Sequence, residues 1–321
     1  MKRILRLTLA RFAFPLLVSM TPMAVLASGA QEPLKVVASF SILADMVKQV
    51  GGDEVAVVSL VGPDSDAHVF DPSPADSRQL AAADLVVVNG LGFEGWIDRL
   101  IKSSGFKGQL VVASQGVQPL KSEADSEGHK DDHKGSHQHG HPNDHDSVDP
   151  HAWQNLRNGM VYVRNIRQAI IKARPQSLAA INARAKAYMA QMSELDQQTK
   201  ARLAQIPINE RRIITSHDAF EYFAQAYDVK FFGLQGWTTQ REVSAADMAA
   251  LIRDIRRDKA RALFVESMSD PRLLQRVAEE AGVKIGGKLY SDALSPPGTA
   301  ADTYLKMFRY NVDQIGMALQ H

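Results

Sequence analysis

Residues 175–207 read PQSLAAINARAKAYMAQMSELDQQTKARLAQIP, and they join two halves of the chain that share one pattern of strands and helices. Side chains that suit a buried helix face recur along it every three or four residues, at Leu178, Ile181, Ala185, Tyr188, Met192, Leu195 and Thr199. The pattern predicts one long helix between the two prolines, from 176 to 206. At ~1.5 Å per residue its 31 residues would span about 46 Å. A helix of that length can run along both halves of a two-lobed protein.

On each side of this helix, short apolar runs alternate with helical patterns. They predict four strands before the helix and four after it, at 34–39, 54–60, 84–90, 109–114, 211–216, 229–234, 261–267 and 284–290. Short, continuous apolar strands are typical of parallel sheets covered on both faces. The predicted fold class is therefore α/β, with two lobes that each contain a four-stranded, mostly parallel sheet flanked by helices. The predicted boundaries are 31–174 for the N-terminal lobe, 175–207 for the linking helix and 208–321 for the C-terminal lobe.

The first 30 residues have the layout of a secretory signal peptide. Four basic side chains lie within the first eleven residues, an apolar run (12–27) follows, and small residues place cleavage after Ala27 or Ala30. The alternative is a transmembrane anchor, but the run is shorter than the ~20 residues that a span needs and contains two prolines. We therefore expect an exported protein that does not itself span a membrane.

The amino-acid composition further narrows the class of protein. The chain has 321 residues and a formal net charge of +1, which gives no indication of a nucleic-acid partner. It has no cysteine, so neither a disulfide nor a thiolate ligand is available, and no cysteine follows the signal peptide to carry a lipid. The expected location is the periplasm of a Gram-negative bacterium, as a free and monomeric protein.

A histidine-rich stretch interrupts the alternating pattern. Residues 128–153 read GHKDDHKGSHQHGHPNDHDSVDPHAW and hold seven of the ten histidines. Residues 122–148 contain almost nothing apolar, so they cannot bury enough surface to offset the entropy of ordering, and a disordered loop is predicted there. The loop contains six histidines, namely His129, His133, His137, His139, His141 and His145. The seventh, His151, follows it.

Ligand-type side chains follow four of the predicted strands. In open α/β sheets, ligands bind beyond the carboxyl ends of the strands. In the N-terminal lobe, His68 follows the second strand and His151 follows the fourth, once the loop is set aside. In the C-terminal lobe, His217 follows the first strand and Asp292 follows the last. If the lobes face each other, the four side chains converge in the cleft.

Three imidazoles and one carboxylate suit Zn²⁺ in a closed four-coordinate site, whereas Mn²⁺ tends to prefer more oxygen ligands. The four residues are separated by 83, 66 and 75 positions, so a shared metal would tie both lobes together. Spacing alone does not establish convergence, because nothing here is as local as a His-Glu-x-x-His helix. The alternative for each histidine is a capping role or a hydrogen bond in the core.

Six motifs together resemble the periplasmic zinc- and manganese-binding proteins of ABC importers, which form cluster A-I of the solute-binding proteins (the ZnuA/TroA-like family). The motifs are VASFSILADMV (37–47), GPDSDAHVFDPSPAD (62–76), DPHAWQNLRNG (149–159), TSHDAFEYFAQAYDV (215–229), ALFVESMSDPR (262–272) and LYSDAL (289–294). The resemblance covers essentially the whole mature chain. It implies two pseudo-symmetric lobes joined by a rigid helix and delivery of metal to a membrane permease. It also implies a ligand set of His68, His151, His217 and Asp292.

The resemblance also bears on the metal. In this family a glutamate at the third ligand position goes with manganese importers and a histidine more often with zinc, and this chain has His217 there. A histidine-rich insertion before DPHAW is similar to the zinc members. Zn²⁺ is therefore the expected metal, with Mn²⁺, or both metals, as the alternative. The loop histidines are expected either to collect metal weakly for the cleft or to form a solvated insertion that binds metal incidentally.

Three functions other than transport are alternative interpretations of the sequence. A zinc hydrolase would keep a coordination position open for water, and four protein ligands with no obvious general base argue against it, so no enzyme is expected. A surface adhesin lacks support because no lipid-anchor cysteine or sorting segment is present. A periplasmic zinc metallochaperone stays open, since binding measurements do not separate it from a transporter component. Outside the ligand set, Glu266 is either a hydrogen-bond partner of a ligating histidine or a structural residue, and Trp153 and Trp237 are predicted to be packing residues.

Overall fold

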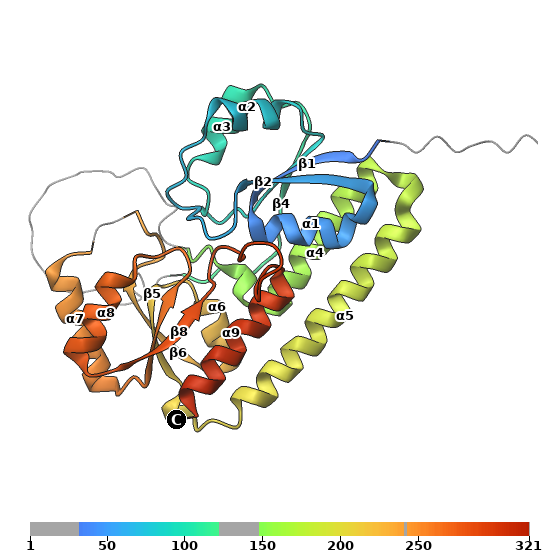
Figure 1. Cartoon of the computed structure of the whole chain (residues 1–321). Helices are drawn as coiled ribbons and strands as arrows, with labels where there is room; N and C mark the ends of the chain where they lie inside the picture. Colours follow the sequence, from blue (N-terminus) through green and yellow to red (C-terminus); the bar gives the residue numbers. More distant parts are fainter. Residues whose placement is uncertain (1–31, 122–147, 241–242, 321) are drawn as a thin grey trace, which may run out of the picture. The chain divides into compact units, whose positions relative to one another are not determined.

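The computed structural model describes residues 32–121, 148–240 and 243–320 (Figure 1). The predicted signal peptide (1–30) and the six loop histidines between 129 and 145 lie outside these residues, so the predictions about them stay predictions. From Pro33 onward the chain forms one compact unit. In the described part of the chain, no helix is both long and apolar enough to cross a bilayer.

The first sheet is parallel throughout and has the strand order β2-β1-β3-β4. Its strands are β1 (Leu34–Phe40), β2 (Val55–Val61), β3 (Leu85–Val88) and β4 (Gln109–Val112). The connecting segments contain α1 (Ser41–Gly51), a 3-10 turn η1 (Gly52–Glu54), α2 (Pro74–Ala81) and α3 (Ile97–Ser104). Helix α2 begins as predicted, because the Ser73 hydroxyl accepts from the backbone N–H of Asp76 and Pro74 occupies the first turn.

The linking helix is shorter than predicted. After the first sheet the chain forms η4 (Ala152–Gln154), α4 (Leu156–Ala173), η5 (Pro175–Ser177) and α5 (Leu178–Leu203). Helix α5 lies alongside α4 and α9 (Figure 1). Its 26 residues span about 39 Å rather than 46 Å, because Pro175 starts a separate 3-10 turn and the residue before Pro207 is restricted to extended backbone. The predicted inner face is buried except for Leu178, which is 47% exposed.

The second sheet repeats the first. Its strands are β5 (Arg212–His217), β6 (Lys230–Gln235), β7 (Ala262–Glu266) and β8 (Lys284–Leu289), all parallel and in the order β6-β5-β7-β8. The other elements are η6 (Ile208–Glu210), α6 (Glu221–Tyr227), α7 (Ala245–Asp258), α8 (Pro271–Ala281) and α9 (Tyr304–Leu319). In each lobe the second strand along the chain (β2 or β6) forms an edge of the sheet, and the first (β1 or β5) lies beside it. The predicted α/β fold class, with a four-stranded parallel sheet in each lobe, is confirmed.

The helical pattern of the sequence begins at Thr299, but the last helix itself begins later. Helix α9 starts at Tyr304. The Thr303 side chain caps it by accepting a hydrogen bond from the backbone N–H of Lys306. The backbone N–H of Tyr304 donates to Asp45 Oδ2 on α1, at 2.8 Å. The start of this C-terminal helix is therefore anchored on the N-terminal lobe.

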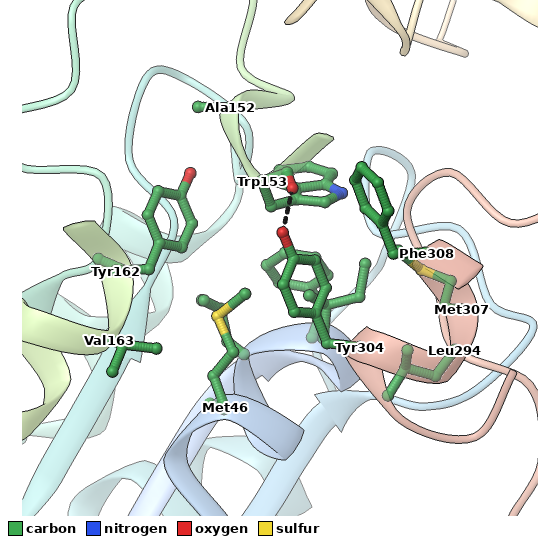
Figure 2. Close-up of a cluster of buried hydrophobic side chains, with 14 of the residues drawn as sticks. Met46, Ala152, Trp153, Tyr162, Val163, Leu294, Tyr304, Met307 and Phe308 are labelled. Atoms are coloured by element: carbon green, nitrogen blue, oxygen red, sulfur yellow. Dashed lines mark hydrogen bonds between the residues drawn. The ribbon is translucent and has the colours of Figure 1, made fainter. Parts of the chain in front are cut away.

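One apolar core extends through both lobes. It includes buried side chains of β1, α1, α4, α5, α6 and α9, while a smaller cluster fills the space between β5, β7, α7 and α8. Figure 2 shows the part where the lobes meet, with Trp153 from η4 beside Phe308 and Tyr304 from α9. The Tyr304 hydroxyl donates a hydrogen bond to the Trp153 carbonyl. Because this core is shared, separating the lobes would expose apolar surface to water.

Candidate metal centre

The four predicted ligands come together at the carboxyl ends of the strands. His68 lies in the loop between β2 and α2, and His151 lies immediately before η4. His217 is the last residue of β5, and Asp292 lies three residues after β8. Two parallel sheets whose strand ends face each other produce this placement. All four side chains are buried, and His68 is the most accessible at 4%.

The ligand-type atoms form a compact cluster. His68 Nε2 lies 3.3 Å from His151 Nε2 and 3.3 Å from Asp292 Oδ2. His217 Nε2 lies 3.1 Å from Asp292 Oδ2, and His151 Nε2 lies 3.6 Å from Asp292 Oδ1. Taking one atom from each residue, all four lie within 4.8 Å of one another.

These separations fit a small tetrahedral cation. Ligand atoms that lie ~2.0–2.1 Å from a tetrahedral Zn²⁺ are roughly 3.3 Å apart, and the measured separations of 3.1–3.6 Å bracket that value. Both Asp292 carboxylate oxygens and His217 Nε2 are buried without a well-formed hydrogen bond to any described residue. Such atoms are costly in a folded protein, and a cation between them would satisfy them.

Two further carboxylates hold the rings of His151 and His217. Asp149 Oδ1 lies 2.7 Å from His151 Nδ1 and also accepts from the His151 backbone N–H at 2.9 Å. Glu266 Oε2 lies 2.6 Å from His217 Nδ1, while its other oxygen accepts from the His217 backbone N–H at 2.9 Å. A carboxylate at Nδ1 leaves Nε2 to face a metal and makes the imidazole a stronger ligand.

One of these two carboxylates, Glu266, was predicted from the sequence. The hypothesis that Glu266 contacts a ligand-type histidine is confirmed. Asp149 was missed, although its position in DPH carried a signal, because an Asp side chain often accepts from the backbone N–H two residues further on. The packing prediction for Trp153 is confirmed by its complete burial. Trp237 is half-buried and borders a cavity beside His68.

The charges in the cluster balance one another. Burial lowers the pKa of His151, but Asp292 and Asp149 outweigh it and raise that pKa to about 9. Burial likewise opposes charge on His217, yet Glu266 and Asp292 raise the pKa of His217 well above its usual value. Burial would raise the pKa of Asp292, but the two histidines hold it well below its usual range. Without metal the histidine protons therefore compensate the carboxylates, and a binding cation displaces them.

We expect Asp149→Asn and Glu266→Gln each to weaken metal binding by about 10–100-fold. Both substitutions preserve shape but remove the negative charge that orients a ring and strengthens it as a ligand. Competition with a chelator of known affinity measures the change. Asp45→Asn is the matched control, because Asp45 is also a buried carboxyl but lies on α1 and accepts from Tyr304 instead. An equal loss in the control would assign the effect to general loosening of the fold.

Two lobes that hold a cation-sized cluster of buried ligand atoms between their strand ends define a binding protein for a single metal ion. The chain belongs to the family described as the periplasmic component A of the zinc-uptake complex (ZnuA), whose profile matches residues 36–318. This family provides the substrate-binding components of metal ABC transporters, and its members are not enzymes. The family resemblance expected from the six motifs is thus confirmed.

Individual relatives match over nearly their whole length. The chain is 32% identical over 299 residues to the metal ABC transporter substrate-binding lipoprotein SsaB of Streptococcus sanguinis, covering 91% of each protein. It is 30% identical over 292 residues to the manganese ABC transporter substrate-binding lipoprotein ScaA of Streptococcus gordonii, covering 89% of each. The solved structure of the periplasmic zinc-binding protein TroA from Treponema pallidum superposes with a TM-score of 0.80 at 29% identity, covering 89% of this chain and 99% of TroA.

The relatives differ in the metal and the anchor that their names state. One is named for manganese and another for zinc, so the family defines a metal-binding protein without defining the metal. Two are named lipoproteins, whereas the sequence of this chain contains no cysteine. The expectation of a periplasmic protein without a lipid anchor therefore stays a prediction.

Proposed function

We propose that the protein captures Zn²⁺ between its lobes and delivers it to the membrane permease of an ABC importer. The ligands in this proposal are His68, His151, His217 and Asp292. The observation that carries it is the convergence of four buried ligand-type side chains, two from each lobe, whose ligand atoms all lie within 4.8 Å of one another. The zinc is cargo, and no covalent step is required. Four protein ligands also fill the position that a catalytic zinc keeps open for water, which argues against a hydrolase.

Manganese is the alternative cargo, and one geometric feature favours it. Both oxygens of Asp292 face histidine nitrogens, with Oδ2 3.1 Å from His217 Nε2 and Oδ1 3.6 Å from His151 Nε2. A carboxylate in this position could bind through both oxygens and raise the coordination number above four, which suits Mn²⁺ better than Zn²⁺. Three imidazole nitrogens in the same site still favour Zn²⁺, and zinc is the cargo we propose.

The histidine-rich loop is proposed as a weak collector of metal for the cleft. Its flanking residues Lys121 and Val148 pair as an antiparallel bridge, and Val148 lies only three residues before His151. Metal held by the loop histidines would therefore be tethered to the site, at an effective concentration that reaches roughly the millimolar range for a short flexible linker. Export by the predicted signal peptide would place both loop and cleft in the periplasm.

The proposed function is tested by titrating Zn²⁺ against a competing chelator with mature protein that lacks residues 125–146. The deletion is needed because the loop histidines could imitate a tight site in the complete chain. It is compatible with the fold, since the bridge between Lys121 and Val148 can be closed by the four residues that remain between them.

We expect the loop-deleted protein to bind one equivalent of Zn²⁺ with a Kd in the nanomolar range or below. That result would assign tight binding to the cleft. If tight binding disappears with the loop, the four-residue site is wrong and the loop alone binds metal. A parallel titration with Mn²⁺ separates the two candidate cargoes only in combination with uptake measurements, because Zn²⁺ outcompetes Mn²⁺ at many sites that serve Mn²⁺ in cells.

A further inference from the structure

His68 is held differently from the other three ligand-type residues. His151 and His217 each have a carboxylate at Nδ1, whereas Asp292 provides the only carboxylate that pairs with the His68 ring among the described residues. The loop that contains His68, residues 62–73 between β2 and α2, has no helix or strand. The His68 ring packs against Phe93, with ring centroids 4.7 Å apart, and its backbone makes further contacts.

Those contacts cross from one lobe to the other. The His68 backbone N–H donates to Asp66 Oδ1 at 2.8 Å, and Asp66 Oδ2 accepts from the Thr239 hydroxyl at 2.6 Å. The His68 carbonyl accepts from Gln240 Nε2, also at 2.8 Å. Thr239 and Gln240 lie in the turn that follows β6, so they belong to the C-terminal lobe, whereas Asp66 and His68 belong to the N-terminal lobe. The His68 carbonyl thus bonds directly to a residue of the C-terminal lobe, and the His68 N–H is linked to that lobe through Asp66.

These contacts lie where solvent can reach them. A cavity of about 1020 Å³ is lined by His68 together with Trp237, Thr238 and Gln240. Gln240 is exposed and Thr239 is half-buried, whereas His151, His217 and Asp292 are at most 1% exposed. Moving His68 away from the cluster would break its backbone hydrogen bonds with Asp66 and Gln240, and the bond with Gln240 lies at the wall of the cavity. Moving any of the other three would disturb a fully buried group.

We propose that Thr239 and Gln240 are positioning residues that form a latch on His68, and that opening this latch is the first step of metal release. The inference rests on the proposed function, because it takes His68 as a ligand of the captured metal. Asp66 transmits the Thr239 contact to the His68 backbone. The latch spans the two lobes, so a small displacement of the turn after β6 would free His68 while the remaining ligands stay in place.

The test measures how fast Zn²⁺ leaves the full mature chain. Protein loaded with one equivalent of Zn²⁺ is mixed with excess chelator, and the slow phase of metal loss reports the cleft site. Because a single hydrogen bond contributes modestly, Thr239→Val and Gln240→Ala are each expected to speed this phase by about 3–10-fold. The double variant is expected to speed it further, by roughly 10–100-fold. Thr239→Ser, which keeps the hydroxyl, should restore the parent rate.

Gln198→Ala is the matched control, because Gln198 donates its amide hydrogen bond to Glu194 within α5, away from the cleft. The latch predicts an unchanged release rate in this control. A double variant that releases metal at the parent rate would overturn the latch while leaving the proposed function intact. Equal acceleration in Gln198→Ala would overturn it as well, by showing a non-specific effect. A parent protein with no slow phase would instead remove the proposed cleft site, and the latch with it.

Discussion

Asp292→Asn is expected to weaken metal binding by on the order of a thousandfold. Asp292 is the only carboxylate among the four proposed ligands, and its oxygens lie 3.1–3.6 Å from nitrogens of all three histidines. Removing one partner from a buried group of charges costs about 3–5 kcal/mol, and every ~1.4 kcal/mol is a tenfold change in affinity. Three neutral imidazoles and an amide would also leave no negative charge on the atoms that face the cation, and only Asp149 and Glu266, on the far side of two rings, would offset its charge.

The measurement is a chelator competition on loop-deleted protein, which removes the contribution of the loop histidines. Asp313→Asn provides the matched control, because Asp313 is about half-exposed and forms an ion pair with Arg202 at 2.7 Å. The control should bind like the parent. An affinity within tenfold of the parent for Asp292→Asn would exclude Asp292 as a ligand, and the cluster would then have to hold metal through histidines alone.

The placement of the four proposed ligands was predictable from the sequence because it follows from topology. Short apolar runs alternating with helical patterns fix parallel sheets, and the carboxyl ends of parallel strands share one edge. His217 at the end of β5 and Asp292 just after β8 needed no further information. The convergence of the two lobes did not follow from spacing, and it came from the resemblance of six motifs to a known family.

Contacts that depend on the folded arrangement of loops could not be predicted in the same way. The turn after β6 is separated from His68 by more than 170 residues, and no periodicity links Gln240 to the His68 carbonyl. The late start of α9 has a similar cause. The pattern from 299 onward is helical, but the chain is held as a loop until Thr303, and the first backbone N–H of α9 is fixed by Asp45 on the other lobe. Propensity alone does not contain such tertiary contacts.

The interface between the lobes has two parts with different roles. The shared core around Trp153 packs the two lobes against each other, whereas the hydrogen bond from Gln240 to His68 lies at the wall of a cavity. Under the proposed latch, the first part keeps three of the proposed ligands in place while His68 moves away. This arrangement predicts that release is a local movement of His68 and its latch, and that disrupting the core damages folding before it changes release.

Trp153→Ala is therefore expected to be the most destabilising single substitution, at about 3–5 kcal/mol in the free energy of unfolding. The Trp153 ring is completely buried and lies against the rings of Phe40 and Phe93, with centroids 5.0 and 4.8 Å away. Its Nε1 donates to the Ser291 carbonyl at 2.9 Å, which fixes the backbone next to Asp292. Alanine would leave a large cavity between the lobes and remove that hydrogen bond.

Denaturant unfolding of the metal-free protein measures this loss without a contribution from bound metal. Trp153→Phe retains most of the ring but not the Nε1 donor, so it is expected to cost about 1–2 kcal/mol, the value of a lost buried hydrogen bond with partial repacking. Trp237→Ala is the matched control, since Trp237 is only half-buried at the cavity wall. A free energy of unfolding for Trp153→Ala within about 1 kcal/mol of the parent value would contradict the role of the shared core. A core that fixes the lobes against each other cannot lose a fully buried tryptophan at so small a cost.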